Sequence, residues 1–438
     1  MRPLKSLTLE AIIEILREEF KKVPDKRRAK SISWEMNDVL MAGYAMMFFQ
    51  NESLLEFQRR MKKKKGQSNL ETILGVKEIP SDSQMREILD QAATEPLRRL
   101  VGKLFEKIRQ VGWAKRWVSE IEGRDYYTVA IDGTEYFHSL KIECEGCLKR
   151  EYVKGIPHYS HQLVSATLIK SGTHQVLPLD VEEVKNTYGT EKQDCEINAG
   201  KRLIERIRTE HRQLSICIIG DDIYSHEPFI EELRENRCEF VLVAKDSSHL
   251  ELAEQIQQHQ MEGLIEQGSW TTQVGKKIRN YEYRILNQVD LTKSKKVKLN
   301  YFQVWERDSS NSLLYHNSWV TDLVVTKYNV SHLFQIGRSR WKIENEQFNV
   351  QKNHGYHITH NFGHGQHNLS FVFYLLNLLA FISHLILEMG TSLYHEARGF
   401  LSRRAFWGDL RTLFDRILFT SWLSLLTFYM DDSVNSSP

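Results

Sequence analysis

The sequence predicts an α/β protein in which a mixed sheet with a β-rich insertion is preceded by a helical module and followed by further helices. Apolar residues recur at every third or fourth position in the first part of the chain, as in amphipathic helices. Strand-like segments then alternate with helical ones, which is typical of a mixed sheet. A third stretch is strand-like almost throughout. The expected divisions are 1–120 (helical module), 121–261 (first part of the core), 262–326 (β-rich insertion), 327–390 (core helices) and 391–438 (C-terminal helical segment, a candidate for dimerisation).

The composition is that of a globular protein close to electrical neutrality. Of the 438 residues, 41% are hydrophobic and 26% are charged, which excludes disorder of the whole chain. The formal net charge of +2 argues against a histone-like coat of basic residues. Five cysteines are too few and too irregularly spaced for a disulfide framework, so we expect a reducing, cytoplasmic setting.

Basic charge is concentrated in the helical module. Its 120 residues include 24 basic and 17 acidic ones, a net charge of +7, so the remaining 318 residues carry −5. Two runs supply most of the surplus, KKVPDKRRAK at 21–30 and RRMKKKKG at 59–66. One such run is often only a solvated surface, but two in one module favour contact with phosphates. The candidate contacts are Arg27, Arg28, Lys62 and Lys63.

Strands dominate the chain from about residue 123. YYTVAIDGTEYF (126–137) is rich in β-branched and aromatic residues and alternates like a strand. Two further strands flank the turn Ser171-Gly172. A helix at 189–211 then leads into the strand SICIIGDD, and a helix at 227–236 leads into CEFVLVAKD. Antiparallel strands followed by alternating helices and strands predict a mixed sheet.

The stretch 369–387, LSFVFYLLNLLAFISHLIL, is long enough to cross a bilayer. It contains Asn377, Ser383 and His384, lacks a partner span and is followed by a polar stretch. Because polar groups are costly in lipid, we expect a buried core helix instead of a membrane span.

Three acidic residues stand where a rigid framework can present them. Asp132 ends the apolar strand VAID and precedes a glycine, where we expect the backbone to turn sharply away. Asp221 directly follows the strand ICIIG. Glu344 lies in the helix RWKIENEQF, where it is expected to share the packed face marked by Trp341 and Phe348. Singly, such residues are often turn residues, caps or ion-pair partners. As a set they suit Mg²⁺, which prefers oxygen ligands, and pairs of such ions promote phosphodiester chemistry.

Five segments of the chain together resemble the DDE transposases of bacterial insertion sequences, in the group typified by insertion sequence four. These segments are IDGTEYF, IPSDSQMREILD, GDDIYSHEPF, RWKIENEQFN and NHGYHITHNFGHG. The similarity covers nearly the whole chain. It implies a ribonuclease-H-like core that binds transposon terminal inverted repeats, cleaves them and transfers the 3′ ends to target DNA with two Mg²⁺ or Mn²⁺ ions. It also implies double-stranded DNA as partner, a homodimer in the synaptic complex, a bacterial, nucleoid-associated location and no membrane.

By this resemblance, the catalytic metal ligands are Asp132, Asp221 and Glu344. Asp222 and Glu346 are the alternatives for the second and third ligands. Further implied DNA contacts are Arg340, Trp341, Lys342 and Lys352.

Two positions depart from the family pattern. Gly337 stands where the family has Tyr, and Gln351 stands where it has Lys, although Lys352 is adjacent. Since those family residues handle the terminal phosphate and support hairpin formation in some members, cleavage with and without a hairpin intermediate stay open as alternatives.

Cysteine and histidine residues provide a candidate zinc site. Cys144 and Cys147, followed by His158 and His161, have the ligand types of a Cys₂His₂ site. The HxxH pair is one residue shorter than usual, so an unliganded loop is the alternative. The histidine-rich run NHGYHITHNFGHGQH (353–367) is interpreted as a structural or DNA-facing loop.

Other classes of enzyme lack support in the sequence. No GxSxG element of a serine hydrolase and no GxxxxGK phosphate loop occurs. Two alternatives to a transposase stay open: a nuclease of the same fold without strand transfer, and a catalytically silent DNA-binding derivative.

Overall fold

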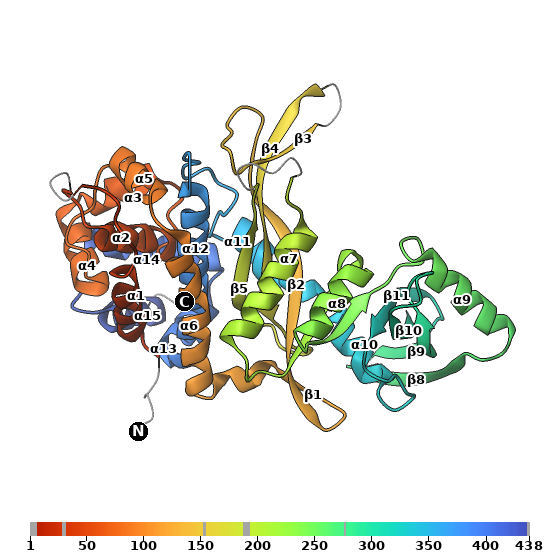
Figure 1. The fold of residues 1–438 in the computed structure, drawn as a ribbon. Coiled ribbons are helices and arrows are strands. Elements are labelled where there is room, and N and C mark those ends of the chain that lie inside the picture. Colours follow the sequence, from red (N-terminus) through yellow and green to blue (C-terminus); the bar gives the residue numbers. More distant parts are fainter. Residues whose placement is uncertain (1–6, 29–31, 152–154, 187–192, 276, 436–438) are drawn as a thin grey trace.

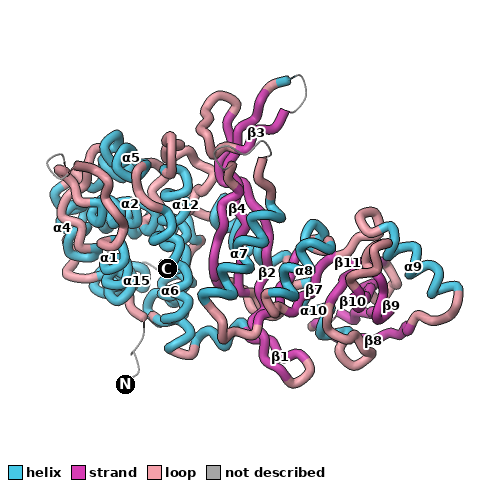
Figure 2. The backbone as a smooth tube through the Cα atoms, in the orientation of Figure 1, coloured by secondary structure: helices cyan, strands magenta, loops and turns pink. Residues whose placement is uncertain are grey.

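The computed structural model describes residues 7–28, 32–151, 155–186, 193–275 and 277–435. Within them the chain forms a helical lobe, a central sheet and a β-rich extension of that sheet (Figure 1). Figure 2 shows many helices gathered in the lobe, further helices beside the sheet and its extension, and strands running from the centre into the extension. The end of the basic run at 21–30 lies outside the described residues.

Six α-helices and a short 3₁₀ turn from the described residues of the first part of the chain build one half of the lobe; five of the helices are amphipathic, while α2 is buried almost throughout. Polar side chains cap several of them: Ser53 accepts from the backbone N–H of Glu56, and Ser81 forms a capping box with Gln84. Their apolar faces pack into a continuous core. The bounds are Leu9–Phe20 (α1), Met36–Phe48 (α2), Leu54–Met61 (α3), Lys64–Leu74 (α4), Asp82–Asp90 (α5), Thr94–Gln110 (α6) and Trp113–Trp117 (η2).

Four C-terminal helices complete the same lobe, so the first and last parts of the chain lie together (Figure 1). The amide of Asn69 donates to the carbonyls of Phe414 and Ile417, and the rings of Phe49 and Phe414 lie 4.4 Å apart. The C-terminal segment is therefore built into the core of the helical module. The bounds are Leu369–Gly390 (α12), Ser392–Phe400 (α13), Arg403–Arg416 (α14) and Trp422–Asn435 (α15).

Helix α12 is the one helix of the described chain that is long and apolar enough to cross a membrane. The lobe covers it, because 94% of its most apolar window is buried. Some of its polar groups find partners there: Tyr44 donates to Ser383 at 2.9 Å, and the Asn377 amide nitrogen donates to the carbonyl of Tyr356 at 2.7 Å. The expectation of a buried core helix is confirmed.

The central sheet is mixed, with the strand order β5-β4-β2-β6-β7. Strand β4 pairs antiparallel with both β2 and β5, while β6 and β7 run parallel to β2. Helices α7 (Glu196–Glu210) and α8 (Glu227–Glu235) connect the parallel strands, as the alternating pattern predicts. The strand bounds are Val118–Ile121 (β1), Arg124–Ser139 (β2), Leu148–Glu151 (β3), Pro157–Leu168 (β4), Leu177–Val184 (β5), Ile216–Gly220 (β6) and Glu239–Val243 (β7).

One expected strand end is wrong. The backbone does not turn away after Asp132, because β2 continues to Ser139 in register with β4. Gly133 instead allows the Glu196 side chain to lie close to the backbone, since a Cβ atom at this position would lie 2.5 Å from a carboxylate oxygen of Glu196. The pairing of β2 with β6 ends near Asp132, because Ala130 is the last residue of β2 that pairs with β6.

The predicted β-rich insertion extends the central sheet. Strand β11 pairs with β7 in antiparallel register, which brings the sheet to eleven strands with α9 beside its far end (Figure 1). The chain then returns through α10 to a π-helical segment, η5. The bounds are Leu250–Met261 (α9), Glu266–Val274 (β8), Lys277–Asp290 (β9), Lys298–Arg307 (β10), Leu313–Thr321 (β11), Val330–Arg338 (α10), Ile343–Phe348 (η5) and Asn349–Asn353 (α11).

Candidate functional site

The three predicted carboxylates approach one another at the end of the sheet where the pairing of β2 with β6 stops. Asp221 directly follows β6 and begins the 3₁₀ turn η4 (Asp222–Tyr224). The parallel register pairs Ala130 of β2 with Ile219 of β6, and two further residues along each chain bring Asp132 level with Asp221. Glu344 approaches this end of the sheet from η5. Rigid strands therefore place two of the acids, and a helical segment brings the third from outside the sheet.

A guanidinium group joins the first and third acids. Nη1 of Arg340 donates to Oδ2 of Asp132 at 3.0 Å and to Oε1 of Glu344 at 2.8 Å. The Asp132 side chain is 16% exposed and that of Glu344 is 51% exposed. Glu344 thus lies at the open side of the site, while Asp132 lies deeper.

The π-helical segment carries Glu344 on a well-anchored support. The Gln347 amide donates to the Ser165 hydroxyl at 3.0 Å, and its carbonyl accepts from Thr167; both partners are on β4. Ile343 and Phe348 are buried on the same segment, but Trp341 is 40% exposed. The expectation that Trp341 marks the packed face is wrong, because π-helical winding changes which residues share a face. Its ring lies instead against the Lys342 ammonium, at 4.7 Å.

The electrostatics of the site are those of a cation site. Burial, together with the charges of Glu344 and Glu196, raises the pKa of Asp132 to about 7, although Arg340 opposes this change. Burial disfavours the charge of Arg340, yet Asp132, Asp221 and Glu344 together raise its pKa. Three acids therefore share one cation. The guanidinium marks the position of a cation between these acids. With Arg340 moved away, their carboxylate oxygens would suit a divalent ion such as Mg²⁺, which prefers oxygen ligands.

The alternative acids have other partners. Asp222 accepts from the backbone N–H of Lys245 at 2.6 Å and from the Ser248 hydroxyl, so it holds the loop after β7. Glu346 lies 4.0 Å from His174. This geometry favours Asp221 over Asp222 and Glu344 over Glu346.

The two departures from the family pattern each have a structural counterpart. The buried indole of Trp319 fills the space beside Gly337, where a Cβ atom would lie 2.5 Å from its nitrogen. Gln351 is fully buried. The neighbouring Lys352 faces the acids: burial lowers its pKa, while the charges of Glu135 and Asp132 act to raise it.

The predicted DNA contacts differ in what they touch. Lys342 is buried and its ammonium donates to the carbonyl of Thr173, which leaves it little access to a duplex. Arg27 binds Asp25 at 2.6 Å, and Lys63 lies 3.3 Å from Asp415. The exposed members of the predicted set are Arg28, Lys62, Lys63 and Trp341.

The cysteine and histidine residues form a second cluster, with one member different from the prediction. Cys144, Cys147 and His161 come together with His364, and their ligand atoms all lie within 4.8 Å of one another. His158 points elsewhere: its Nδ1 lies 2.8 Å from Nε2 of His138. Alternate residues of a strand face opposite sides, so the two histidines of the HxxH pair, three apart on β4, cannot share one face. The expectation for His158 is therefore contradicted by the geometry.

Sequence reasoning missed Glu196 and the role of His364. Glu196 accepts from the Tyr224 hydroxyl at 2.8 Å and adds negative charge beside Asp132. Its only local sign is a position in the first turn of α7, which many acids share. His364 was visible in the histidine-rich run, but nothing in that run distinguishes it from its four neighbours.

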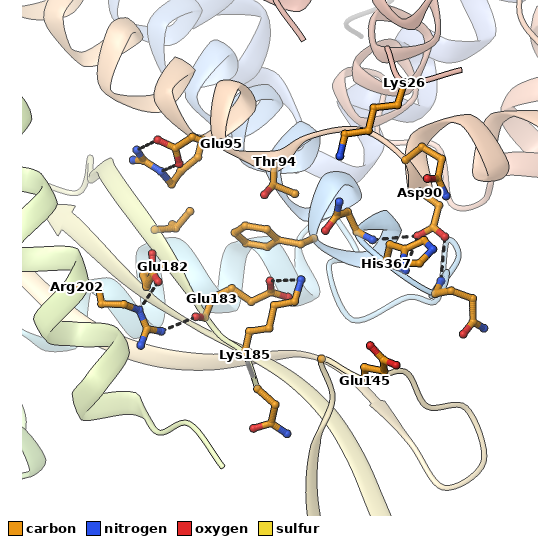
Figure 3. A pocket seen from close by; sticks show the side chains of 18 of the residues that line it. Lys26, Asp90, Thr94, Glu95, Glu145, Glu182, Glu183, Lys185, Arg202 and His367 are labelled. Carbon is orange, nitrogen blue, oxygen red and sulfur yellow. Dashed lines mark hydrogen bonds and ion pairs between the residues drawn. The ribbon is translucent and has the colours of Figure 1, made fainter. Parts of the chain in front are cut away.

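A cavity of about 1160 Å³ lies away from the carboxylates, between the helical lobe and the edge of the sheet (Figure 3). Its lining side chains pair with one another, as Arg202 with Glu182 at 2.6 Å and Lys185 with Glu183 at 3.9 Å. Its lining carries five acids against four Lys and Arg residues, so it offers a polyanion no net positive charge. We therefore place the candidate active site at the carboxylates and not in this cavity.

Comparison with known families gives one result. Residues 171–382 match the family model described as "Transposase DDE domain". The matched range includes Asp221 and Glu344 and begins after Asp132. The match supports a DDE-type transposase, whose substrate class is DNA and whose family generally uses divalent metals. No curated protein matches the sequence.

Proposed function

We propose that this protein is a DNA transposase that binds transposon terminal inverted repeats, cleaves them and transfers the 3′ ends to target DNA by two-metal phosphoryl transfer. The observation that carries the proposal is the approach of Asp132, Asp221 and Glu344 to one shared cation position. Two of these acids lie inside the matched transposase domain.

The sheet topology supports a ribonuclease-H-like core. Three antiparallel strands, β5, β4 and β2, are followed by β6 and β7 parallel to β2, in the order β5-β4-β2-β6-β7. In this arrangement the first acid stands on the central strand and the second follows the strand beside it. The third arrives from a helical segment after the insertion, which lets a long β-rich insertion occur without moving the first two acids.

The acids and their neighbours have separable roles in the proposed reaction. Asp132 and Asp221 are fixed by the sheet and would hold Mg²⁺ or Mn²⁺ with Glu344. Two bound ions supply activation of the attacking oxygen and stabilisation of the leaving oxygen. Arg340, released from the acids, lies where it could bind a phosphate, and Lys352 offers a second positive charge on the same side.

The helical module is the part of the chain that we propose binds the transposon ends. The exposed lysines of the run at 59–66 suit the phosphate backbone, because Lys and Arg contacts to phosphates supply most non-specific affinity for DNA. We also propose that two chains act together in a synaptic complex and that the protein works at the bacterial nucleoid.

Cleavage of uncut transposon ends and strand transfer of pre-cut ends, both in Mg²⁺, together test the proposal. We expect joined product from the wild type. Cleavage without joining would show a nuclease, and a gel shift without either would show a silent DNA-binding protein. Asp132→Asn should abolish cleavage and leave end binding intact. Asp125→Asn, an exposed acid on the same strand, is the matched control and should retain activity. Cleavage by Asp132→Asn would contradict the assignment of that residue.

A further inference from the structure

The cluster formed by Cys144, Cys147, His161 and His364 has the dimensions of a filled metal site. The two sulfur atoms lie 3.8 Å apart, and Nε2 of His161 lies 3.5 Å from each of them. Nε2 of His364 lies 3.4 Å from the sulfur of Cys147 and 3.1 Å from Nε2 of His161. Three of the four residues are at most 7% exposed.

Five of the six separations among the four ligand atoms match a tetrahedron around zinc, and the sixth, between Cys144 and His364, lies within 4.8 Å. With Zn–S bonds of about 2.3 Å and Zn–N bonds of about 2.05 Å, tetrahedral angles give about 3.8 Å between sulfurs, about 3.55 Å between sulfur and nitrogen and about 3.35 Å between nitrogens. The five distances in the structure agree with these values to about 0.3 Å. We propose that Cys144, Cys147, His161 and His364 bind one Zn²⁺ ion in a closed structural site.

Polar groups beside both histidines, a hydrogen-bonded carbonyl at His364 and a carboxylate at His161, suit rings that bind a metal through Nε2. Nδ1 of His364 lies 2.8 Å from the carbonyl oxygen of Gly365. A carbonyl only accepts, so Nδ1 carries the proton and Nε2 presents its lone pair to the cluster. Nδ1 of His161 lies 3.4 Å from a carboxylate oxygen of Glu183, which Tyr136 also holds at 2.7 Å. Carboxylate and carbonyl partners of this kind orient zinc-binding histidines.

Other occupants fit the cluster less well. A disulfide needs its sulfur atoms about 2.05 Å apart, so Cys144 and Cys147 would have to approach and leave both imidazoles without a partner. Mg²⁺ and Ca²⁺ require oxygen ligands, and the four ligand atoms are two sulfurs and two nitrogens. Two thiolates and two neutral imidazoles suit zinc.

The ion would join segments that are far apart in sequence. Cys144 and Cys147 lie between β2 and β3, His161 lies on β4, and His364 lies 203 residues further on, between α11 and α12. The loop that carries His364 also contacts the helical lobe, because Asp90 of α5 accepts four backbone N–H groups from residues 366–369. Zinc would therefore fix this loop to the sheet on one side while Asp90 fixes it to the lobe on the other.

The test is the metal content of the full-length protein, purified without a polyhistidine tag and measured by mass spectrometry of the elements. We expect one zinc ion per wild-type chain. His364→Ala should lose the zinc and unfold at a lower temperature. His158→Ala is the matched control and should keep the zinc, because its side chain faces away from the cluster. Retention of zinc by His364→Ala, or its loss from His158→Ala, would overturn the ligand set.

A second measurement keeps the proposal testable if His364→Ala does not fold. The wild type is prepared with Co²⁺ in place of zinc, and its absorption spectrum is recorded. We expect thiolate-to-cobalt charge transfer and the intense visible bands of tetrahedral Co²⁺. A wild type without zinc, in which Cys144 and Cys147 are joined as a disulfide, would overturn the proposal, as would an octahedral cobalt spectrum.

Discussion

The carboxylate site and the Cys₂His₂ cluster are two candidate metal sites built in opposite ways. At the carboxylate site one acid is half exposed, and an internal cation, Arg340, lies between the ligands. At the cluster the ligands already have tetrahedral separations, and carbonyl and carboxylate groups hold both histidines. We therefore propose that the first site exchanges ions and admits a substrate, whereas the second is closed. On this proposal one site serves chemistry and the other stability.

The largest expected effect distinguishes two neighbouring acids of η5. Glu344→Gln should lower the rate of DNA-end cleavage by at least about 10²–10³-fold, the scale of losing one group that stabilises charge in the transition state. Glu346→Gln should have a small effect, since Glu346 lies beside His174 and not beside Asp132. Single-turnover cleavage of a labelled end measures both variants. Equal losses of cleavage rate in Glu344→Gln and Glu346→Gln would contradict the assignment of Glu344, and not Glu346, as the catalytic acid.

The next effect concerns metal exchange at the two sites. Brief dialysis of the full-length protein against EDTA should abolish cleavage, and Mg²⁺ alone should then restore it. The zinc content should stay unchanged through this cycle, because three of its four ligands are buried and a four-ligand site has no open position. Cleavage and elemental zinc are measured on the same samples. A need for added Zn²⁺ would show that the cluster exchanges its ion as readily as the carboxylates do.

The smallest effect concerns the support of the cluster and not its ligands. Asp90→Asn should lower the free energy of unfolding by about 1–3 kcal/mol, since four N–H groups lose a charged acceptor. Burial acts to raise the pKa of Asp90, but these donors lower it overall. Its stabilisation is therefore present at neutral pH and is lost as the pH falls through the lowered pKa. Denaturant unfolding at several pH values should show the two proteins converging in acid, and both should contain zinc when purified at neutral pH.

Much of the fold follows from local pattern. Helical periodicity predicted that the first part of the chain is helical, and strand-like alternation predicted β2, the two strands around Ser171-Gly172 (β4 and β5) and a β-rich insertion. The buried character of α12 was also readable, because Asn377, Ser383 and His384 interrupt an otherwise apolar stretch. The end of β2 was not readable. Gly133 is a turn signal in isolation, but here it makes room for the carboxylate of Glu196.

The sequence by itself determined which residue types are available for chemistry: the three acids with Arg340, and the Cys144–Cys147 pair. Only the tertiary structure decided their partners. Spacing along the chain selected His158 as a zinc ligand, but the strand turns that side chain toward His138, and packing brings His364 into its place. Local sequence constrains backbone conformation over a few residues, whereas a ligand set needs groups 203 residues apart within hydrogen-bonding distance. That proximity is set by how the lobe and the sheet pack together.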